Sequence, residues 1–192
     1  MYLIDSHCHL DFKQFDQNRK QILSHCQQLG IKDIVVPGVT ADSWKKLLRI
    51  CQQSAMLHPA LGLHPMFMEQ HQPEHLIQLS EFISDHALIA IGEIGLDFYI
   101  ANPDKDAQIH LFTEQLNIAQ QTDLPVLLHV RKAHEQTIKL LKQYPLTSGI
   151  VHAFSGSLQQ AKTISRFRFC IRYRWSHYTS SCNTITDNGQ PT

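Results

Sequence analysis

Two histidines lie close to the start of the chain, one residue apart. His7 and His9 flank Cys8 and follow the short apolar run at residues 2–4. Because side chains alternate along a strand, both imidazoles would point to the same side of the chain where that strand ends. Neutral imidazole is the most common protein ligand for a divalent metal ion. The spacing indicates a metal site, although such a pair also arises by chance in a chain with 13 histidines.

Three further candidate ligands stand at the ends of later apolar segments. They are Glu93, His129 and His152. A carboxylate buried among apolar residues is unfavourable unless cations pair with it, and its two oxygens could bridge two metal ions. His7 and His9 would then serve one ion, and His129 and His152 the other. The alternative is that each histidine is an ordinary capped or hydrogen-bonded core residue.

The segments that carry these residues alternate between strand and helix patterns. The short apolar runs that we expect to be strands occupy residues 3–6, 33–37, 57–61, 88–92, 125–128 and 149–151, and apolar residues recur at helical spacing between them. Six such units in succession predict a parallel sheet with right-handed crossovers. A doubly wound sheet would carry a glycine-rich phosphate loop after its first strand, and none is present. Because the candidate ligands follow strand ends, we predict an α/β fold of the (β/α)8 TIM-barrel type, incomplete, with about six units present.

Composition narrows the classes of protein to consider. With 192 residues, 43% of them hydrophobic, the chain is long enough to bury a core as one domain. The five cysteines are an odd number without CxxC spacing, which indicates reduced thiols. The sequence shows neither a leader pattern nor a run of roughly 18 apolar residues, so we expect a cytoplasmic protein without membrane association. Residues 1–165 carry 13 Lys and Arg against 16 Asp and Glu, so any nucleic-acid chemistry would depend on a local site.

Five segments together resemble the successive motifs of the TatD family, which are metal-dependent deoxyribonucleases with an amidohydrolase-like barrel. The resemblance covers residues 1 to about 165 in the same order and spacing. The segments are Asp5-Ser6-His7-Cys8-His9-Leu10, Gly62-Leu63-His64-Pro65, Gly92-Glu93-Ile94-Gly95-Leu96-Asp97, Leu128-His129-Val130-Arg131 and His152-Ala153-Phe154-Ser155-Gly156-Ser157.

The resemblance implies a role for each matching residue. The metal ligands would be His7, His9, Glu93, His129 and His152, with Glu93 as the bridge. His64 and Arg131 match positions that meet the scissile phosphate, and a guanidinium suits this because it can bind phosphate through two hydrogen bonds. We therefore expect Glu93, His64 and Arg131 to be catalytic. Two divalent ions per site are implied; the histidines favour Zn or Mn, and Mg would serve with substrate oxygens.

The pattern departs from the family near the C-terminus. The family's last ligand is an aspartate after strand eight, but the only acidic residue after position 150 is Asp187, in a turn-like setting. Arginines alternate with aromatic residues through 166–175, where the family has a glycine-rich strand. Three interpretations are open: an amphipathic strand, a nucleic-acid-binding arm that combines phosphate contacts with base stacking, or out-of-frame translation. We favour the third and expect a partial hydrolase barrel over residues 1–165 and an atypical basic and aromatic tail, out of frame or disordered, over 166–192.

The expected function is hydrolysis of phosphodiester bonds by an exonuclease-type TatD-like DNase with a dinuclear metal centre. DNA is the expected substrate, and we infer no obligate protein partner. Two alternatives remain: a hydrolase of amides or esters, since similar barrels support both chemistries, and a metal-binding fragment with impaired catalysis. Because the late aspartate is missing, we expect the chain to be a weaker enzyme than its full-length relatives.

Overall fold

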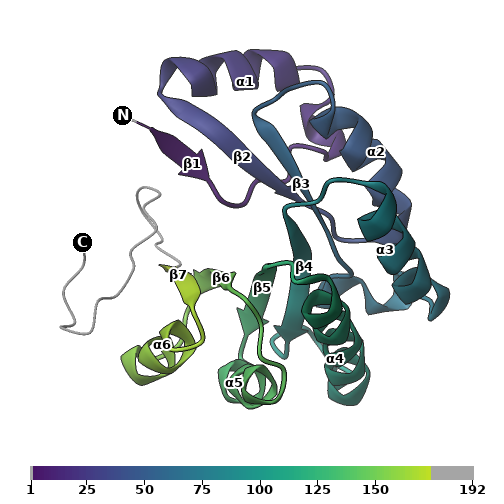
Figure 1. Ribbon diagram of the computed structural model, residues 1–192, viewed down its shortest axis with the longest axis vertical. Coiled ribbons are helices and arrows are strands. Elements are labelled where there is room, and N and C mark those ends of the chain that lie inside the picture. The colour runs from purple at the N-terminus through teal and green to yellow at the C-terminus, as the bar shows by residue number, and fades with distance from the viewer. Residues whose placement is uncertain (1, 174–192) are drawn as a thin grey trace.

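Seven parallel strands form one curved sheet in the computed structural model, which describes residues 2–173 (Figure 1). The strands are β1 (Leu3–Asp5), β2 (Ile31–Pro37), β3 (Leu57–Leu61), β4 (Ala90–Asp97), β5 (Val126–Arg131), β6 (Gly149–Phe154) and β7 (Phe169–Tyr173). They lie side by side in chain order, each paired in parallel with the next. A doubly wound sheet would reverse its strand order at a switch point, and this sheet does not. The predicted barrel-type winding is therefore confirmed, with six strand–helix units followed by β7.

A helix follows each of the first six strands and covers the outer face of the sheet (Figure 1). The helices are α1 (Arg19–Gln28), α2 (Ala41–Cys51), α3 (Glu74–Asp85), α4 (Lys105–Thr122), α5 (His134–Gln143) and α6 (Leu158–Ser165), with short 3₁₀ helices η1 (Lys13–Phe15) and η2 (Pro65–Gln70). None of the helices described within residues 2–173 is both long and apolar enough to cross a membrane.

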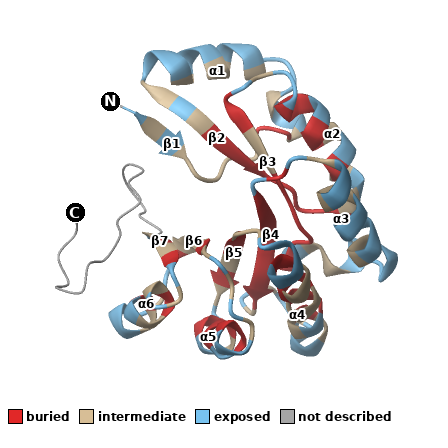
Figure 2. Cartoon of the chain, viewed as in Figure 1, coloured by how far each residue is buried: buried red, intermediate tan, exposed pale blue. Residues whose placement is uncertain are grey.

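Apolar side chains bury both faces of the strands. Those facing the helices form the larger cluster, to which Ile34 and Val36 of β2 belong. Val35, between them, belongs to a smaller cluster on the inner face together with Ala60, Ala90 and Leu127. This division follows from the alternation of side chains along a strand. Figure 2 shows the result: the central strands are buried, and the helices expose their outer sides.

The strands that carry the candidate ligands run further than the apolar runs predict. We expected the fourth strand to end at Gly92, but β4 continues to Asp97, and β5 and β6 likewise extend past their apolar runs to Arg131 and Phe154. The predicted ends were wrong because polar residues of the inner face interrupt the apolar pattern without interrupting the strand. Apolar residues such as Ile94 and Leu96 continue on the outer face, where both are fully buried.

Part of the Arg and aromatic segment is an ordinary strand of this sheet. Phe169 and Ile171 of β7 are 4% and 1% exposed, whereas Cys170 and Arg172 between them are half-buried. Of the three interpretations of this segment, the amphipathic strand describes residues 169–173. The Nη1 atom of Arg172 lies 3.4 Å from Oδ1 of Asp5, at the end of β1. Residues 174–192 lie outside the described part of the chain, so the boundary at residue 165 stays a prediction.

Candidate metal centre

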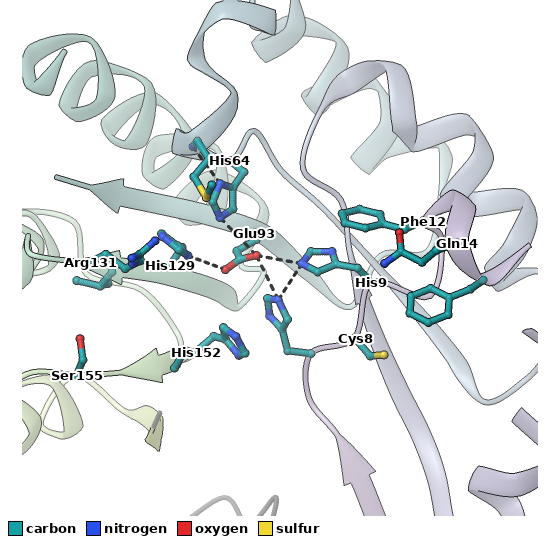
Figure 3. Close-up of a pocket in the computed structure, with 15 residues that line it drawn as sticks. Cys8, His9, Phe12, Gln14, His64, Glu93, His129, Arg131, His152 and Ser155 are labelled. Carbon is teal, nitrogen blue, oxygen red and sulfur yellow. Dashed lines mark hydrogen bonds and ion pairs between the residues drawn. The ribbon is translucent and has the colours of Figure 1, made fainter. Parts of the chain in front are cut away.

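The candidate ligands gather around one buried carboxylate at the carboxyl ends of the strands. Glu93 in β4 is 2% exposed, and histidines point toward it from several elements (Figure 3). His7 and His9 follow β1, His64 follows β3, and His129 lies in β5. The two oxygens of Glu93 face different sets of nitrogens, so the carboxylate divides the centre into two groups.

The first group consists of His7, His9 and Glu93. The Nε2 atoms of His7 and His9 are 3.2 and 3.5 Å from Oε2 of Glu93 and 3.1 Å from each other. Nδ1 of His9 lies 3.1 Å from the carbonyl oxygen of Pro37. Because a carbonyl can only accept, Nδ1 of His9 carries the proton and its Nε2 presents a lone pair to the centre.

The second group joins His129 to the other oxygen of Glu93. Nδ1 of His129 lies 3.2 Å from Oε1 of Glu93, and Nε2 donates to Oδ2 of Asp97 at 2.9 Å. The fully buried Asp97 carboxylate thus holds the proton on Nε2, so Nδ1 is the nitrogen that His129 turns toward the centre.

His64 lies beside this second group but has the opposite tautomer. Its Nε2 is 3.6 Å from Oε2 of Glu93, while its Nδ1 accepts a hydrogen bond from the backbone N–H of Met66 at 3.0 Å. A neutral imidazole that accepts at Nδ1 must carry its proton on Nε2. His64 therefore presents an N–H donor to the centre, although its nitrogen lies close enough to Glu93 and His129 for a three-ligand set.

The structure places His152 beside His7 rather than against Glu93. The rings of His152 and His7 stack with centroids 3.7 Å apart, and Nδ1 of His152 is buried without a hydrogen-bond partner among the described residues. Burial and the neighbouring His7 lower the pKa of His152 to about 3, so its imidazole is neutral, as a metal ligand must be. His152 lines the same cavity as the two groups. Its assignment to the second ion stays a prediction.

The electrostatics of the centre favour added positive charge. Burial alone raises the pKa of Glu93, but the histidines, with His129 foremost, hold that pKa well below its ordinary value, so the carboxylate is ionised. Burial lowers the pKa of His129, yet its contacts with Asp97 and Glu93 outweigh this and raise that pKa to about 9. Two buried carboxylates thus attract a proton to a histidine that would otherwise be neutral at pH 7.

The spacing of the donor atoms fits metal binding. Two ligands that each stand about 2.0–2.1 Å from a tetrahedral ion lie about 3.3 Å apart. The three distances within the first group, 3.1, 3.2 and 3.5 Å, are close to that value, as is the 3.2 Å separation in the second group. The first group therefore has the spacing of a set of metal ligands, and His129 with Oε1 of Glu93 supplies two donor atoms on the other side of the carboxylate.

Arg131 lies in the wall of the cavity at the centre and pairs with Asp97. The cavity at the centre measures about 610 Å³, and Arg131 forms part of its wall. Nη1 of Arg131 is 3.5 Å from Oδ2 of Asp97, and its guanidinium lies over the ring of Tyr99, 4.4 Å from the centroid. The sequence prediction of the site omitted Asp97. The signal was present: Glu93, Gly95 and Asp97 alternate, so in a strand all three would share one face.

Comparisons with known proteins agree with the fold. A family model described as TatD related DNase matches residues 4–181. The chain therefore belongs to the TatD-related DNase family.

Individual relatives extend this result. The chain is 40% identical over 171 residues to the uncharacterized metal-dependent hydrolase YjjV of Escherichia coli K12, covering 88% of this chain and 66% of that protein. It is similar to the crystal structure of YJJV from the same organism, with a TM-score of 0.85 at 38% identity, covering 88% and 66% of the two chains. It is also 29% identical over 162 residues to the 3'-5' ssDNA/RNA exonuclease TatD of Erwinia tasmaniensis, covering 81% and 61%. The chain thus spans slightly less than two thirds of the length of these relatives.

Proposed function

We propose that this chain is a metal-dependent phosphodiesterase that hydrolyses DNA in the manner of an exonuclease. Two divalent ions, Zn or Mn by the preference of a histidine-rich site, would share the Glu93 carboxylate. His7 and His9 would hold the first ion with Oε2, and His129 and His152 would hold the second with Oε1.

The observation that carries this proposal is that each oxygen of Glu93 faces its own histidine nitrogen, which can present a lone pair to an ion that replaces a proton. Oε2 faces Nε2 of His9, and Oε1 faces Nδ1 of His129. Sites with two metal ions about 3.5–4 Å apart are typical of enzymes that displace an oxygen at phosphorus. One relative is named as an exonuclease of single-stranded DNA and RNA, which supports the same substrate class.

The remaining residues suit the charge of a phosphodiester. Bound divalent ions supply a Lewis acid and activate water for attack on phosphorus. The Nε2–H of His64, held in place by the Met66 N–H, points a donor into the centre where a phosphoryl oxygen would lie. Arg131 lies at the edge of the cavity, half-buried, and a guanidinium there stabilises negative charge that grows on the phosphoryl oxygens.

The test is a substrate and metal comparison on the purified chain. After removal of metal with a chelator, activity should return with Mn or Zn on bis(p-nitrophenyl) phosphate and on a single-stranded oligonucleotide. Glu93→Gln should lower that activity more than about a hundredfold, because changes to residues that only support a ligand already lower activity 10–100-fold. Glu81→Gln, an exposed position on α3, is the matched control. Cleavage of a lactone or a dipeptide amide without cleavage of either phosphodiester would contradict the proposal.

A further inference from the structure

A second hollow adjoins the metal centre on the side of the β5–α5 and β6–α6 loops. It measures about 540 Å³, and its walls include Tyr99, Lys132, His134 and Gln160. Arg131 and Ser155 line both this hollow and the cavity of the metal centre. Figure 3 shows these two side chains, labelled, on the side of the centre away from His9. A ligand that fills the first cavity can therefore continue past Arg131 into the second.

The charge of this hollow is positive. Arg131 and Lys132 are its charged lining residues, and no carboxylate lines it among the described residues. Lys132 is exposed and forms no ion pair with any described residue, so its ammonium is available to a ligand. Two acidic groups contact residues of this lining: Asp97, which pairs with His129 and Arg131, and Glu135, which accepts from Nε2 of Gln160 at 2.6 Å. The hollow thus offers an anion the ammonium of Lys132 and the guanidinium of Arg131, the second of which is shared with Asp97.

Backbone and buried groups form the floor of this hollow. Lys132 has φ 54°, a left-handed conformation that non-glycine residues adopt rarely and that often marks a functional loop. His134, which also lines the hollow, is 9% exposed, and its Nε2 has no hydrogen-bond partner among the described residues. A Cβ at Gly156 would lie 2.6 Å from the Phe154 ring and 2.8 Å from His134, so only glycine lets the β6–α6 loop approach this closely. The floor is therefore built by close packing and retains an unpaired polar group.

One wall of the hollow is a flat aromatic surface. Tyr99 is 62% exposed, an unusual state for a tyrosine that touches a structured site. Its backbone is fixed, because its N–H donates to Oδ1 of Asp97 at 3.0 Å, and one face of its ring lies under Arg131. Aromatic side chains beside cationic grooves are the usual platforms for unpaired bases.

We propose that this second hollow binds the phosphate next to the scissile one, with Lys132 and Arg131 as its cations and Tyr99 as a stacking platform for a base. The inference rests on the proposed function and makes it more specific. The base at Tyr99 would have to be unpaired, because a paired and stacked base has no free face for this ring, and this agrees with the relative named as an exonuclease of single-stranded DNA and RNA. It also extends at least one phosphate beyond the cleaved bond.

Binding measurements on the full chain in chelator test this subsite without any cleavage. The probes are a labelled single-stranded tetranucleotide and the same strand with one neutral methylphosphonate, placed at each linkage in turn. Lys132→Ala should weaken binding of the unmodified strand, and the slope of log K against log salt should fall by about 0.7, the value for one phosphate contact on a single strand. Lys139→Ala, a change at an exposed lysine on α5, should alter neither the affinity nor the salt slope.

Two further variants make the assignment specific. At one linkage, the losses of binding free energy caused by the methylphosphonate and by Lys132→Ala should not add up, because both changes remove the same contact. Additive losses at every linkage would overturn the subsite. Tyr99→Ala should weaken binding about fivefold to a hundredfold, while Tyr99→Phe, which keeps the ring, should bind as the unsubstituted chain does. Equal losses from the two tyrosine variants would exclude stacking.

The outcomes separate this inference from the proposed function. If the chain cleaves phosphodiesters but strand binding does not depend on Lys132 or Tyr99, the subsite is wrong and the hydrolase stands. If strand binding depends on both residues but no phosphodiester is cleaved with any metal, the subsite stands and the hydrolase proposal falls. Circular dichroism confirms that each variant is folded.

Discussion

Asp97→Asn should weaken binding of the second metal ion although the substitution preserves the shape of the side chain. Asp97 accepts hydrogen bonds at both oxygens: Oδ2 from Nε2 of His129 at 2.9 Å and from Nη1 of Arg131 at 3.5 Å, and Oδ1 from the backbone N–H of Tyr99 at 3.0 Å. An amide has one acceptor and one donor end. If its oxygen stays with Tyr99, its NH₂ faces His129 and favours the tautomer with the proton on Nδ1, the nitrogen that faces Glu93.

The magnitude follows from what the substitution leaves unpaired. The opposite orientation of the amide keeps the His129 tautomer but sets the NH₂ against the Tyr99 N–H, in a position that is fully buried. Two donors facing each other without an acceptor cost about 1–3 kcal/mol. Loss of a residue that orients a metal-binding histidine typically lowers metal affinity 10–100-fold, which agrees with that energy. We expect a decrease in this range for one of the two ions and a smaller effect on the other.

Calorimetric titration of Mn or Zn into the metal-free chain measures both affinities. Asp85→Asn, an exposed position on α3, is the control and should bind metal as the unsubstituted chain does. A folded Asp97→Asn variant that binds both ions within twofold of the unsubstituted chain would refute the argument, because the tautomer of His129 would then not depend on Asp97. Thermal unfolding of the metal-free proteins separates this effect from a general loss of stability.

Three further predictions follow from other contacts. Glu93→Gln should reduce metal affinity in calorimetric titrations more than any single histidine change, because the two sets of candidate ligands share the negative charge of Glu93. A larger loss of affinity for His7→Ala would argue against bridging by Glu93. Gly95→Ala should destabilise the fold by at least about 1–3 kcal/mol in denaturant unfolding, since φ is 138° and a Cβ would lie 2.1 Å from the His129 carbonyl oxygen; unchanged stability would contradict that geometry. Ser157→Ala should lower the free energy of unfolding by about 1 kcal/mol, because it removes the capping box of α6, and Ser165→Ala at the other end of the helix should not.

The sequence predicted the order of the elements because their patterns are local. Apolar runs of strand length alternate with helical spacing, and the resulting parallel winding is what the structure shows. The strand ends were harder to predict, because Glu93 and Asp97 are polar residues inside a strand whose outer face remains apolar. The seventh strand was not favoured, because its Arg and aromatic alternation also fits segments that are not part of a fold.

The sequence predicted that His7, His9 and His129 gather near Glu93, but not the arrangement of their atoms. The HxH spacing of His7 and His9 indicates a metal pair from the sequence alone. Which nitrogen of a histidine faces the centre depends on partners from other elements, such as the carbonyl of Pro37 for His9 and the carboxylate of Asp97 for His129. Such long-range hydrogen bonds leave no pattern in the sequence.

The stacked pair of His7 and His152 has a consequence for the order of folding. These residues are 145 positions apart, and they join the first strand of the sheet to the sixth. Contacts between such distant positions form late, because the intervening chain must first be ordered. Nearly the whole described chain must therefore be in place before the centre is assembled. An ion held there would stabilise only the assembled form, so we expect bound metal to slow the unfolding of the sheet.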